Sequence, residues 1–290
     1  MESKKELPKF AVLQLSGCSG CEVSLLNSEE WISEFNLVYM PLVVTSNKIP
    51  DDVEVLLVSG GVRTDEDIHN LRKGASRSKK VIAVGTCALS GGVAQIRENH
   101  PARDAYLHSA HRLRLPDMLP RAYPIDRFVD VDLYLPGCPP TPELFMIALT
   151  EGENAKIASI VCQECGRQKL QDMRPTSSSG MRSGVTLPDI CLINQGYLCV
   201  GTSTRGGCGA LCTRPGHACV GCRGPANPYL NKEPKFVLDN LRRVFTRMTD
   251  IPEEEINEVL ESPWLSLFLD QFTDYTQDES LPTRTKEKMI

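Results

Sequence analysis

The chain has 290 residues, of which 41% are hydrophobic, and a formal net charge of −5. This length and composition suffice for a buried core in one or two domains, and the slightly acidic balance leaves no basic surface typical of nucleic-acid binding. No run of about 18 apolar residues is present, so we expect no membrane-spanning helix. The first residues, MESKKELPKF, carry neither the apolar stretch of a signal peptide nor a twin arginine, so we expect a cytoplasmic protein.

The N-terminal half alternates between strand and helix patterns. Apolar strands are predicted at 10–15, 36–44, 53–60 and 80–88, and another ends within 129–141. Helices are predicted after Cys21 as far as Ile32, at 65–79 and at 142–152. Near-continuous apolar strands alternating with helices indicate an α/β fold whose parallel sheet is covered on both faces. Residues 96–128 are less regular and are interpreted as an insertion with one short helix, whose role the sequence does not reveal.

The composition changes near residue 153. Residues 162–226 hold eight cysteines and many glycines without helical or strand periodicity, so this segment needs metal or covalent links to fold. Helices are predicted at 236–248 and 252–272, followed by a polar, frayed tail of about 15 residues. We therefore expect three parts, which comprise residues 9–152, 153–228 and 229–290.

The chain contains twelve cysteines. In a reducing cytoplasm, so many cysteines more often bind metals or clusters than form disulfides. Twelve divides into three sets of four, which is the ligand number of an iron–sulfur cluster or of a structural zinc ion. The spacing of the cysteines must therefore decide between these interpretations.

Four cysteines are predicted at the carboxyl ends of strands. Cys18 and Cys21 follow the first strand, while Cys87 and Cys138 end the strands at 80–88 and within 129–141. Because the carboxyl ends of parallel strands form one edge of a sheet, we expect the four thiols to meet there. A Cys-x-x-Cys redox dithiol would not need Cys87 and Cys138, so a cluster is favoured, but zinc accepts four thiolates equally well.

The other eight cysteines separate by proximity into two groups of four. The first group is Cys162, Cys165, Cys191 and Cys199, and the second is Cys208, Cys212, Cys219 and Cys222. Crossed pairings remain open, because ligand connectivity does not follow from sequence. The β-hairpins of zinc ribbons are not evident, and successive redox centres in one chain suggest an electron relay. His217 is interpreted as a surface residue or a neighbour of the ligands rather than a ligand, and the other four histidines are interpreted as surface residues.

Six motifs together resemble the small subunit of nickel–iron hydrogenases. They are GCSGCEVSLL, VGTCALSGG, LPGCPPTP, CQEC, GCGALC and CVGC, and the resemblance covers about residues 9–226. The match is to the cytoplasmic group 3 enzymes with three clusters, which include the G subunits of the deazaflavin-non-reducing, or methyl-viologen-reducing, hydrogenases of methanogens. GCSGC and PGCPP also occur in the related cluster-bearing subunit of complex I, whereas all twelve cysteines in order are specific to the hydrogenases.

The resemblance implies a flavodoxin-like N-terminal domain, an irregular cysteine-rich domain with two iron–sulfur clusters, and C-terminal helices. It assigns three 4Fe–4S clusters: a proximal one on Cys18, Cys21, Cys87 and Cys138, a medial one on Cys208, Cys212, Cys219 and Cys222, and a distal one on Cys162, Cys165, Cys191 and Cys199. Periplasmic and membrane-bound relatives open the distal set with histidine and often lack the fourth medial thiolate. Here Cys162 and Cys212 stand at those places, so we expect three low-potential clusters.

The implied function is electron transfer. Electrons from H2 oxidation at the nickel–iron centre of a large subunit would pass through this chain to a further iron–sulfur or flavin subunit, such as a heterodisulfide reductase complex of methanogenesis. No catalytic residue is assigned to this chain. Two alternatives stay open: a complex-I-type quinone reductase subunit, which leaves eight cysteines unexplained, and a zinc-stapled structural protein. The electron acceptor, the direction of H2 turnover and the oligomeric state do not follow from the sequence.

Overall fold

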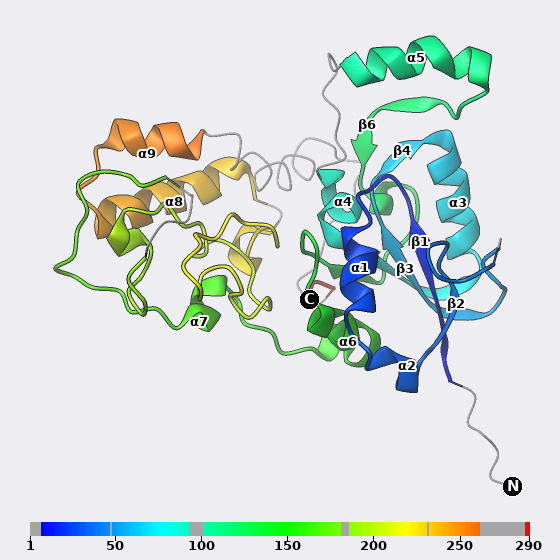
Figure 1. The fold of residues 1–290 in the computed structure, drawn as a ribbon, viewed down its shortest axis with the longest axis horizontal. Coiled ribbons are helices and arrows are strands. Elements are labelled where there is room, and N and C mark those ends of the chain that lie inside the picture. The colour runs from blue at the N-terminus through cyan, green and yellow to red at the C-terminus, as the bar shows by residue number, and fades with distance from the viewer. Residues whose placement is uncertain (1–6, 47, 93–100, 181–185, 231, 262–287) are drawn as a thin grey trace, which may run out of the picture. The chain divides into compact units, whose positions relative to one another are not determined.

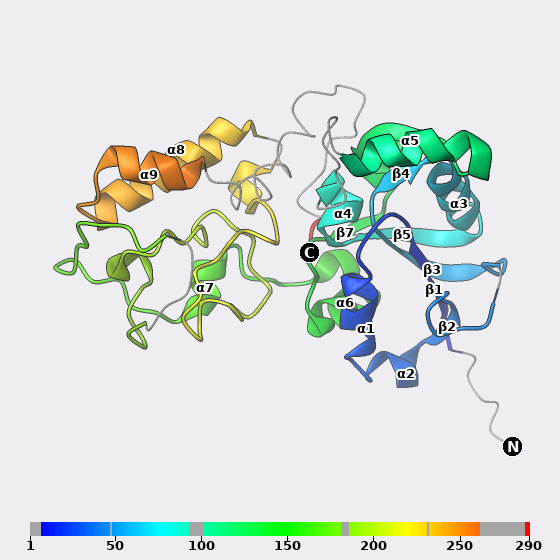
Figure 2. The same cartoon turned by 45° about the horizontal axis from the view of Figure 1, so that its top comes forward.

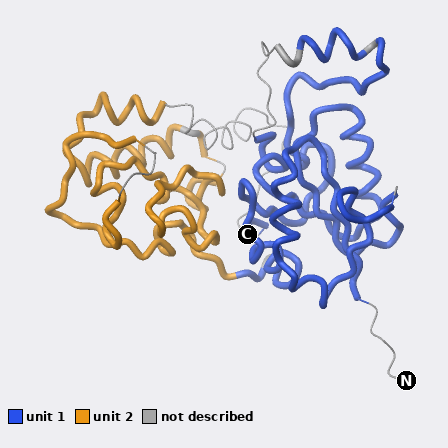
Figure 3. The backbone as a smooth tube through the Cα atoms, viewed as in Figure 1, with its two compact units in different colours: residues 1–155, 280–290 blue, residues 156–279 orange. Residues whose placement is uncertain are grey.

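The computed structural model describes residues 7–46, 48–92, 101–180, 186–230, 232–261 and 288–290. The chain forms two compact units, one of residues 1–155 with 280–290 and one of residues 156–279 (Figure 3). Each unit has a hydrophobic core of its own. The domain boundaries expected near residues 152 and 228 stay predictions. No helix in the described ranges has the length and apolar character needed to cross a membrane.

The first unit is built on a parallel sheet of five strands in the order β2-β1-β3-β5-β7 (Figures 1 and 2). The strands are β1 (Lys9–Gln14), β2 (Asn36–Tyr39), β3 (Val53–Ser59), β5 (Ser78–Val84) and β7 (Leu133–Leu135). Counted within this sheet, the order is 2-1-3-4-5, which is that of flavodoxin-like folds. The predicted α/β class and parallel sheet are therefore confirmed. The direction of winding reverses between β1 and β3, and ligands of such folds bind outside the carboxyl ends of the strands at this point.

Both faces of the sheet are covered by helices. Alternate residues of β1 point to opposite faces: Ala11 and Leu13 belong to the core that contains Leu71 of α3 (Asp65–Ala75). On the other face, Val12 lies beside Leu25 of α1 (Gly20–Leu26) and a residue of α6 (Pro142–Thr150). The two helices α1 and α6 contact each other. This two-sided burial explains why the strands read as continuous apolar runs.

Several elements differ in their bounds from the sequence prediction. The predicted strand 36–44 ends at Tyr39, and the predicted helix after Cys21 is interrupted at 27–30, so that α2 is a separate turn at Trp31–Glu34. The predicted strand 80–88 ends at Val84, because Gly85 takes a φ of +78° and opens the helix α4 (Gly85–Ser90). Cys87 is therefore on a helix, and its placement at the end of a strand was wrong.

The insertion predicted at 96–128 forms regular structure over its described part. Residues 93–100 lie outside the described residues, and α5 (Pro101–Leu113) is longer than the short helix that was expected. The strand β6 (Met118–Tyr123) pairs antiparallel with β4 (Val62–Thr64) to form a second, two-stranded sheet. The sequence predicted neither strand, since β4 has only three residues and carries no readable alternation.

The remaining short elements complete this unit. The 3-10 turns η2 (Ile125–Arg127) and η3 (Gly152–Asn154) follow β6 and α6, respectively. The last three residues, predicted to be frayed, instead pair with β7: Tyr134 donates its backbone N–H to Lys288, and Ile290 donates to Tyr134. Ile290 is buried, which anchors the end of the chain in the first unit.

The second unit is irregular around its cysteines, as predicted. It contains α7 (Val161–Cys165), the turns η4 (Ile193–Gln195) and η5 (Asn227–Tyr229), and two longer helices, α8 (Pro234–Met248) and α9 (Glu253–Leu260). One core combines apolar residues of α8 and α9 with residues beside the cysteines, including Val237, Phe245, Ile256, Leu198 and Val200. The part of the predicted helix 252–272 beyond 261 lies outside the described residues.

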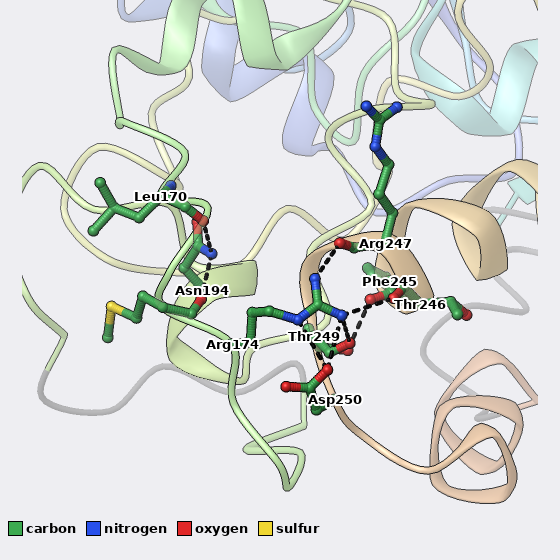
Figure 4. A network of polar contacts seen from close by, with 9 residues as sticks. Leu170, Arg174, Asn194, Phe245, Thr246, Arg247, Thr249 and Asp250 are labelled. Atoms are coloured by element: carbon green, nitrogen blue, oxygen red, sulfur yellow. Dashed lines mark hydrogen bonds and ion pairs between the residues drawn. The ribbon is translucent and has the colours of Figure 1, made fainter.

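The side chain of Arg174, in the cysteine-rich segment, forms hydrogen bonds and an ion pair with residues at the C-terminal end of α8 (Figure 4). Its guanidinium donates to the backbone carbonyls of Thr246, Arg247 and Thr249 and pairs with Asp250 at 2.8 Å. These carbonyls are the acceptors that a helix C-terminus leaves without intrahelical partners, and a cation is favoured at this negative end. A single exposed arginine thus stabilises the junction between the loops and the helices.

Candidate functional site

The loop after β1 carries Cys18 and Cys21. The backbones of Ser16 and Gly61 exchange hydrogen bonds of 3.1 and 2.9 Å, which ties this loop to the loop after β3. Ser19 then takes a left-handed φ of 63° and precedes α1. Cys21 lies in the first turn of α1 and is half-buried, whereas Cys18 lies in the loop and is exposed. Both cysteines therefore lie where the winding of the sheet reverses.

Cys87 and Cys138 come to the same edge from the neighbouring strands. Cys87 lies in the first turn of α4, directly after β5, and Cys138 lies three residues beyond the end of β7. The backbone N–H of Thr86 donates to the carbonyl of Gly137 at 2.9 Å, which fixes the two turns to each other. The peptide between Cys138 and Pro139 is cis. Both thiols are half-buried.

The four N-terminal thiols lie close together. Burial raises the pKa of Cys21 above its ordinary value, and the neighbouring charges of Glu22, Cys87, Cys138 and Cys18 raise it further. A Cβ on Gly85 would lie 2.5 Å from the sulfur of Cys21, so only glycine fits there. The structure thus brings together all four cysteines that the strand pattern predicted, although Cys87 comes from a helix.

The buried carboxylate Glu22 is a feature that was not predicted from the sequence. Its side chain is 2% exposed, and the hydroxyl of Ser59, at the end of β3, donates a hydrogen bond to it. A charged residue directly after Cys21, where an apolar residue would continue the core face, was the available signal. Glu22 thus provides a buried acidic group next to Cys21 of the N-terminal set.

Four cysteines of the second unit form a set around α7: Cys162 and Cys165 lie within this helix, and Cys191 and Cys199 lie near Cys162. Burial raises the pKa of Cys162 to about 11, with Lys169 opposing and Cys191 and Cys165 adding to the effect. Burial also raises the pKa of Cys199 to about 12; the N–H groups of Gly201 and Cys219 act against this, while Cys162 and Cys191 add to it. The four cysteines that are adjacent in sequence are therefore also neighbours in space.

Two side chains hold the loops of this set in position. Asn194, which is 1% exposed, donates to the carbonyls of Leu170 and Met173 at 2.8 and 2.6 Å and accepts from the N–H of Leu170 (Figure 4). Arg167 donates to the carbonyl oxygens of Leu187 and Ile190 at 2.8 Å, next to Cys191. The segment therefore has a defined conformation despite its lack of regular structure.

The last four cysteines adjoin this set. Cys212 is exposed and has Cys208 as its neighbour, while Cys219 is buried. Burial raises the pKa of Cys219, and the charges of Cys199 and Cys222 add to it; hydrogen bonds from Gly221 and Thr204 act against this. The N–H of Cys219 also donates to the sulfur of Cys199 at 3.2 Å. Cys219 is thus the point at which the two groups meet, and their division stays a prediction.

Two arginines are buried beside the last group. Arg223 is 1% exposed and donates from Nε to the carbonyl of Gly206 at 2.8 Å. Burial lowers its pKa to about 10, and the charges of Cys208, Cys222 and Glu164 oppose the shift. Arg205 is 4% exposed, and burial together with the charge of Arg223 lowers its pKa to about 9. Both side chains therefore remain cations at neutral pH, and neither was predicted from the sequence.

The donor sets fit the binding of iron–sulfur clusters. Each site offers thiols, which as thiolates are the soft ligands of such clusters; of the twelve cysteines, two are buried, eight are half-buried and two are exposed. In the described parts of the chain, no three His, Cys, Asp or Glu side chains are close enough to hold a single metal ion. His69, His108 and His217 are exposed, while His100 and the side chain of His111 lie outside the described residues.

Comparisons with known proteins identify the family. Residues 18–151 match a family model described as NADH ubiquinone oxidoreductase, 20 Kd subunit. The chain is 36% identical over 242 residues to the vhu G subunit of the F420-non-reducing hydrogenase of Methanocaldococcus jannaschii, a match that covers 77% of this chain and 84% of that protein. This chain belongs to the small subunits of nickel–iron hydrogenases. As such it is a component of an enzyme complex and pairs with a large subunit.

Further relatives agree with this family. The small subunit is 28% identical over 266 residues to the iron-sulfur G subunit of the F420-non-reducing hydrogenase of Archaeoglobus profundus, covering 76% of this chain and 83% of that one. The solved actinobacterial-type NiFe-hydrogenase from Ralstonia eutropha H16 has a TM-score of 0.51 at 16% identity, covering 88% of this chain and 87% of that chain. The latter similarity concerns the fold alone.

Proposed function

We propose that this small subunit conducts electrons from H2 oxidation, at the nickel–iron centre of the large subunit, through three 4Fe–4S clusters to a further partner. The observation that carries the proposal is the gathering of Cys18, Cys21, Cys87 and Cys138 at the reversal point of the sheet. This set is the proposed proximal site. Its residues come from three separate segments, and the first and the last are 120 positions apart in sequence, which an isolated dithiol would not require.

The second unit would hold the medial and distal clusters. We assign the distal cluster to the set around α7, and the mutual influence of its thiols on their pKa values supports this division. The medial cluster takes Cys208, Cys212, Cys219 and Cys222, and the closeness of Cys219 to Cys199 agrees with adjoining sites. With twelve thiolates and no histidine ligand, the clusters are expected to be of low potential.

The residues of this chain would hold and insulate these centres. When bound, the clusters supply one-electron transfer. The thiolates fix the irons, and the backbone N–H groups of Gly201, Cys219 and Gly221 offer hydrogen bonds to ligand sulfur. The glycines close to Cys21 and Cys87 let the backbone surround the proximal site. Acid and base roles at nickel would lie on the large subunit, so this chain contributes no catalytic residue.

The electron exit would lie beside the distal set. A cavity of about 250 Å³ is lined by Lys169, Arg174 and Arg247, and the charge of Lys169 acts on Cys162 and Cys191. Arg247 extends away from the cluster of contacts around Arg174 (Figure 4). We propose that an acidic face of an iron–sulfur or flavin subunit docks here, as in a heterodisulfide reductase complex. The cytoplasmic location stays a prediction.

A variant without Cys87 tests the proposal. In the anaerobically purified complex, Cys87→Ala should abolish H2-dependent dye reduction and remove the proximal cluster, while the other two clusters remain. Ser19→Ala, which alters the loop between Cys18 and Cys21 but keeps every thiol, serves as the control. Full activity with a complete cluster complement in Cys87→Ala would show that the proximal assignment is wrong. Zinc in place of iron would instead support the structural alternative.

A further inference from the structure

Two guanidinium groups are buried in the second unit, and the charge of one acts on the other. Arg205 and Arg223 are 4% and 1% exposed, and the positive charge of each is taken out of water. A buried cation costs several kcal/mol unless it is paired, and two like charges repel each other in addition. The second unit therefore holds two positive charges in its interior, where only favourable partners can offset their cost.

The hydrogen bonds of Arg205 are incomplete. Its Nε and Nη2 are buried and have no hydrogen-bond partner within the described residues. Its backbone is tied down by the bond of its N–H to the carbonyl of Gly224 at 3.1 Å. Buried guanidinium donors are almost always satisfied, so these two N–H groups call for an acceptor that the described part of the chain does not supply.

The charged surroundings indicate where that acceptor would be. The charges acting on Arg223 are those of Cys208, Cys222 and Glu164, and among the described residues the one acting on Arg205 is that of Arg223. Glu164 accepts a hydrogen bond from the N–H of Gly207 at 2.9 Å, one residue before Cys208. Among the described residues, the anionic groups that act on Arg223 are thus one carboxylate and two ligand thiolates, and none acts on Arg205.

We propose that Arg205 and Arg223 are positioning residues that hold the negative charge of the cluster bound by Cys208, Cys212, Cys219 and Cys222 and raise its reduction potential. This inference rests on the proposed function of the same site. Four thiolates outweigh the positive charge of the cluster core, and one-electron reduction adds a further negative charge. A fixed neighbouring cation stabilises the reduced form more than the oxidised form, so it moves the potential upward.

The pair gives the medial site two buried cations near its thiols. The third buried arginine of the described ranges, Arg63, is in the first unit and donates to the carbonyl of Leu119. The proximal set has the buried acid Glu22 instead. The arginine pair would therefore set the middle potential of the relay apart from those on either side.

Redox-titrated EPR of the complete hydrogenase complex tests this inference. The variants are Arg205→Gln, which removes the charge, Arg205→Lys, which keeps it, and Arg223→Gln. Arg243→Gln, on the exposed face of α8, is the control. The medial signal is identified as the one altered by Cys212→Ser. We expect Arg205→Gln and Arg223→Gln to lower the equilibrium constant for reduction of the medial cluster at least tenfold, which corresponds to about 59 mV in its reduction potential for one electron. Arg205→Lys should lower it less, and Arg243→Gln should leave it unchanged.

The outcomes separate this inference from the proposed function. Absence of iron from the unmodified chain would refute the proposed function itself. Full iron with an unchanged or raised medial potential in both glutamine variants would overturn the inference alone. Loss of the medial irons from Arg205→Gln but not from Arg205→Lys would support it, because the charge would then be needed to retain the cluster. Equal loss from both variants would overturn it, because shape rather than charge would be responsible.

Discussion

Gly85→Ala is a direct test of the geometry of the proximal site. An added Cβ would lie 2.5 Å from the sulfur of Cys21, and the φ of +78° at this position is unfavourable for alanine. The left-handed conformation costs roughly 1–2 kcal/mol and overpacking another 1–3 kcal/mol, so we expect a total cost of about 2–5 kcal/mol unless Cys21 moves. Movement of Cys21 relieves the overlap but withdraws a ligand. The expected result is loss of the proximal cluster, about four of twelve irons.

Gly152→Ala is the matched control for this test. Gly152 has a φ of +56°, but no atom lies within 4 Å of the position where a Cβ would be added. The substitution should reduce the free energy of unfolding only by the cost of a left-handed backbone for alanine, roughly 1–2 kcal/mol, and leave the iron content unchanged. Iron analysis, EPR and thermal unfolding of both anaerobically purified variants distinguish the two effects. A Gly85→Ala protein with full iron and unaltered H2 uptake would refute the claim that Cys21 is held against Gly85.

Two other predictions concern the second unit. Arg174→Ala removes the contacts to the last carbonyls of α8, which we expect to cost about 1–2 kcal/mol because the side chain is partly exposed. Hydrogen exchange should accelerate roughly 5- to 30-fold at the end of α8, against little change in Arg243→Ala, and equal exchange in the two variants would count against the clamp. Lys169→Glu combined with Arg247→Glu should slow electron transfer to the natural partner and reverse its salt dependence, with dye reduction unchanged. An unaltered rate with the partner would rule out docking at this cavity.

The sequence predicts the sheet well because its strands are buried on both faces. Apolar runs such as those of β1 and β3 have no polar alternation to obscure them, and their strand assignments are confirmed. The short strands β4 and β6 were missed because their pairing depends on contacts between distant segments. The end of β5 was placed too late because Gly85 starts α4 through its own positive φ, which an apolar count does not detect.

In the candidate site too, residues within short sequence motifs could be predicted, whereas residues whose positions depend on distant segments could not. The cysteines are recognisable because their spacing and the adjacent glycines lie within short motifs. Arg205 and Arg223 gave no such signal, because an arginine in a polar, glycine-rich segment is normally exposed. Their burial follows from the packing of the cysteine loops, as does the proximity of Cys219 to Cys199. Residues that surround a site are therefore harder to predict than those that bind in it.

Metal content per chain tests the central claim most directly. The anaerobically purified complex should contain about twelve irons on this subunit, in three 4Fe–4S clusters that can each be reduced by H2 through the large subunit. Measured together by elemental analysis and redox-titrated EPR, this count covers all twelve cysteines at once. A colourless subunit with about three zinc ions, or one with only the four irons of the N-terminal set, would contradict the proposed relay.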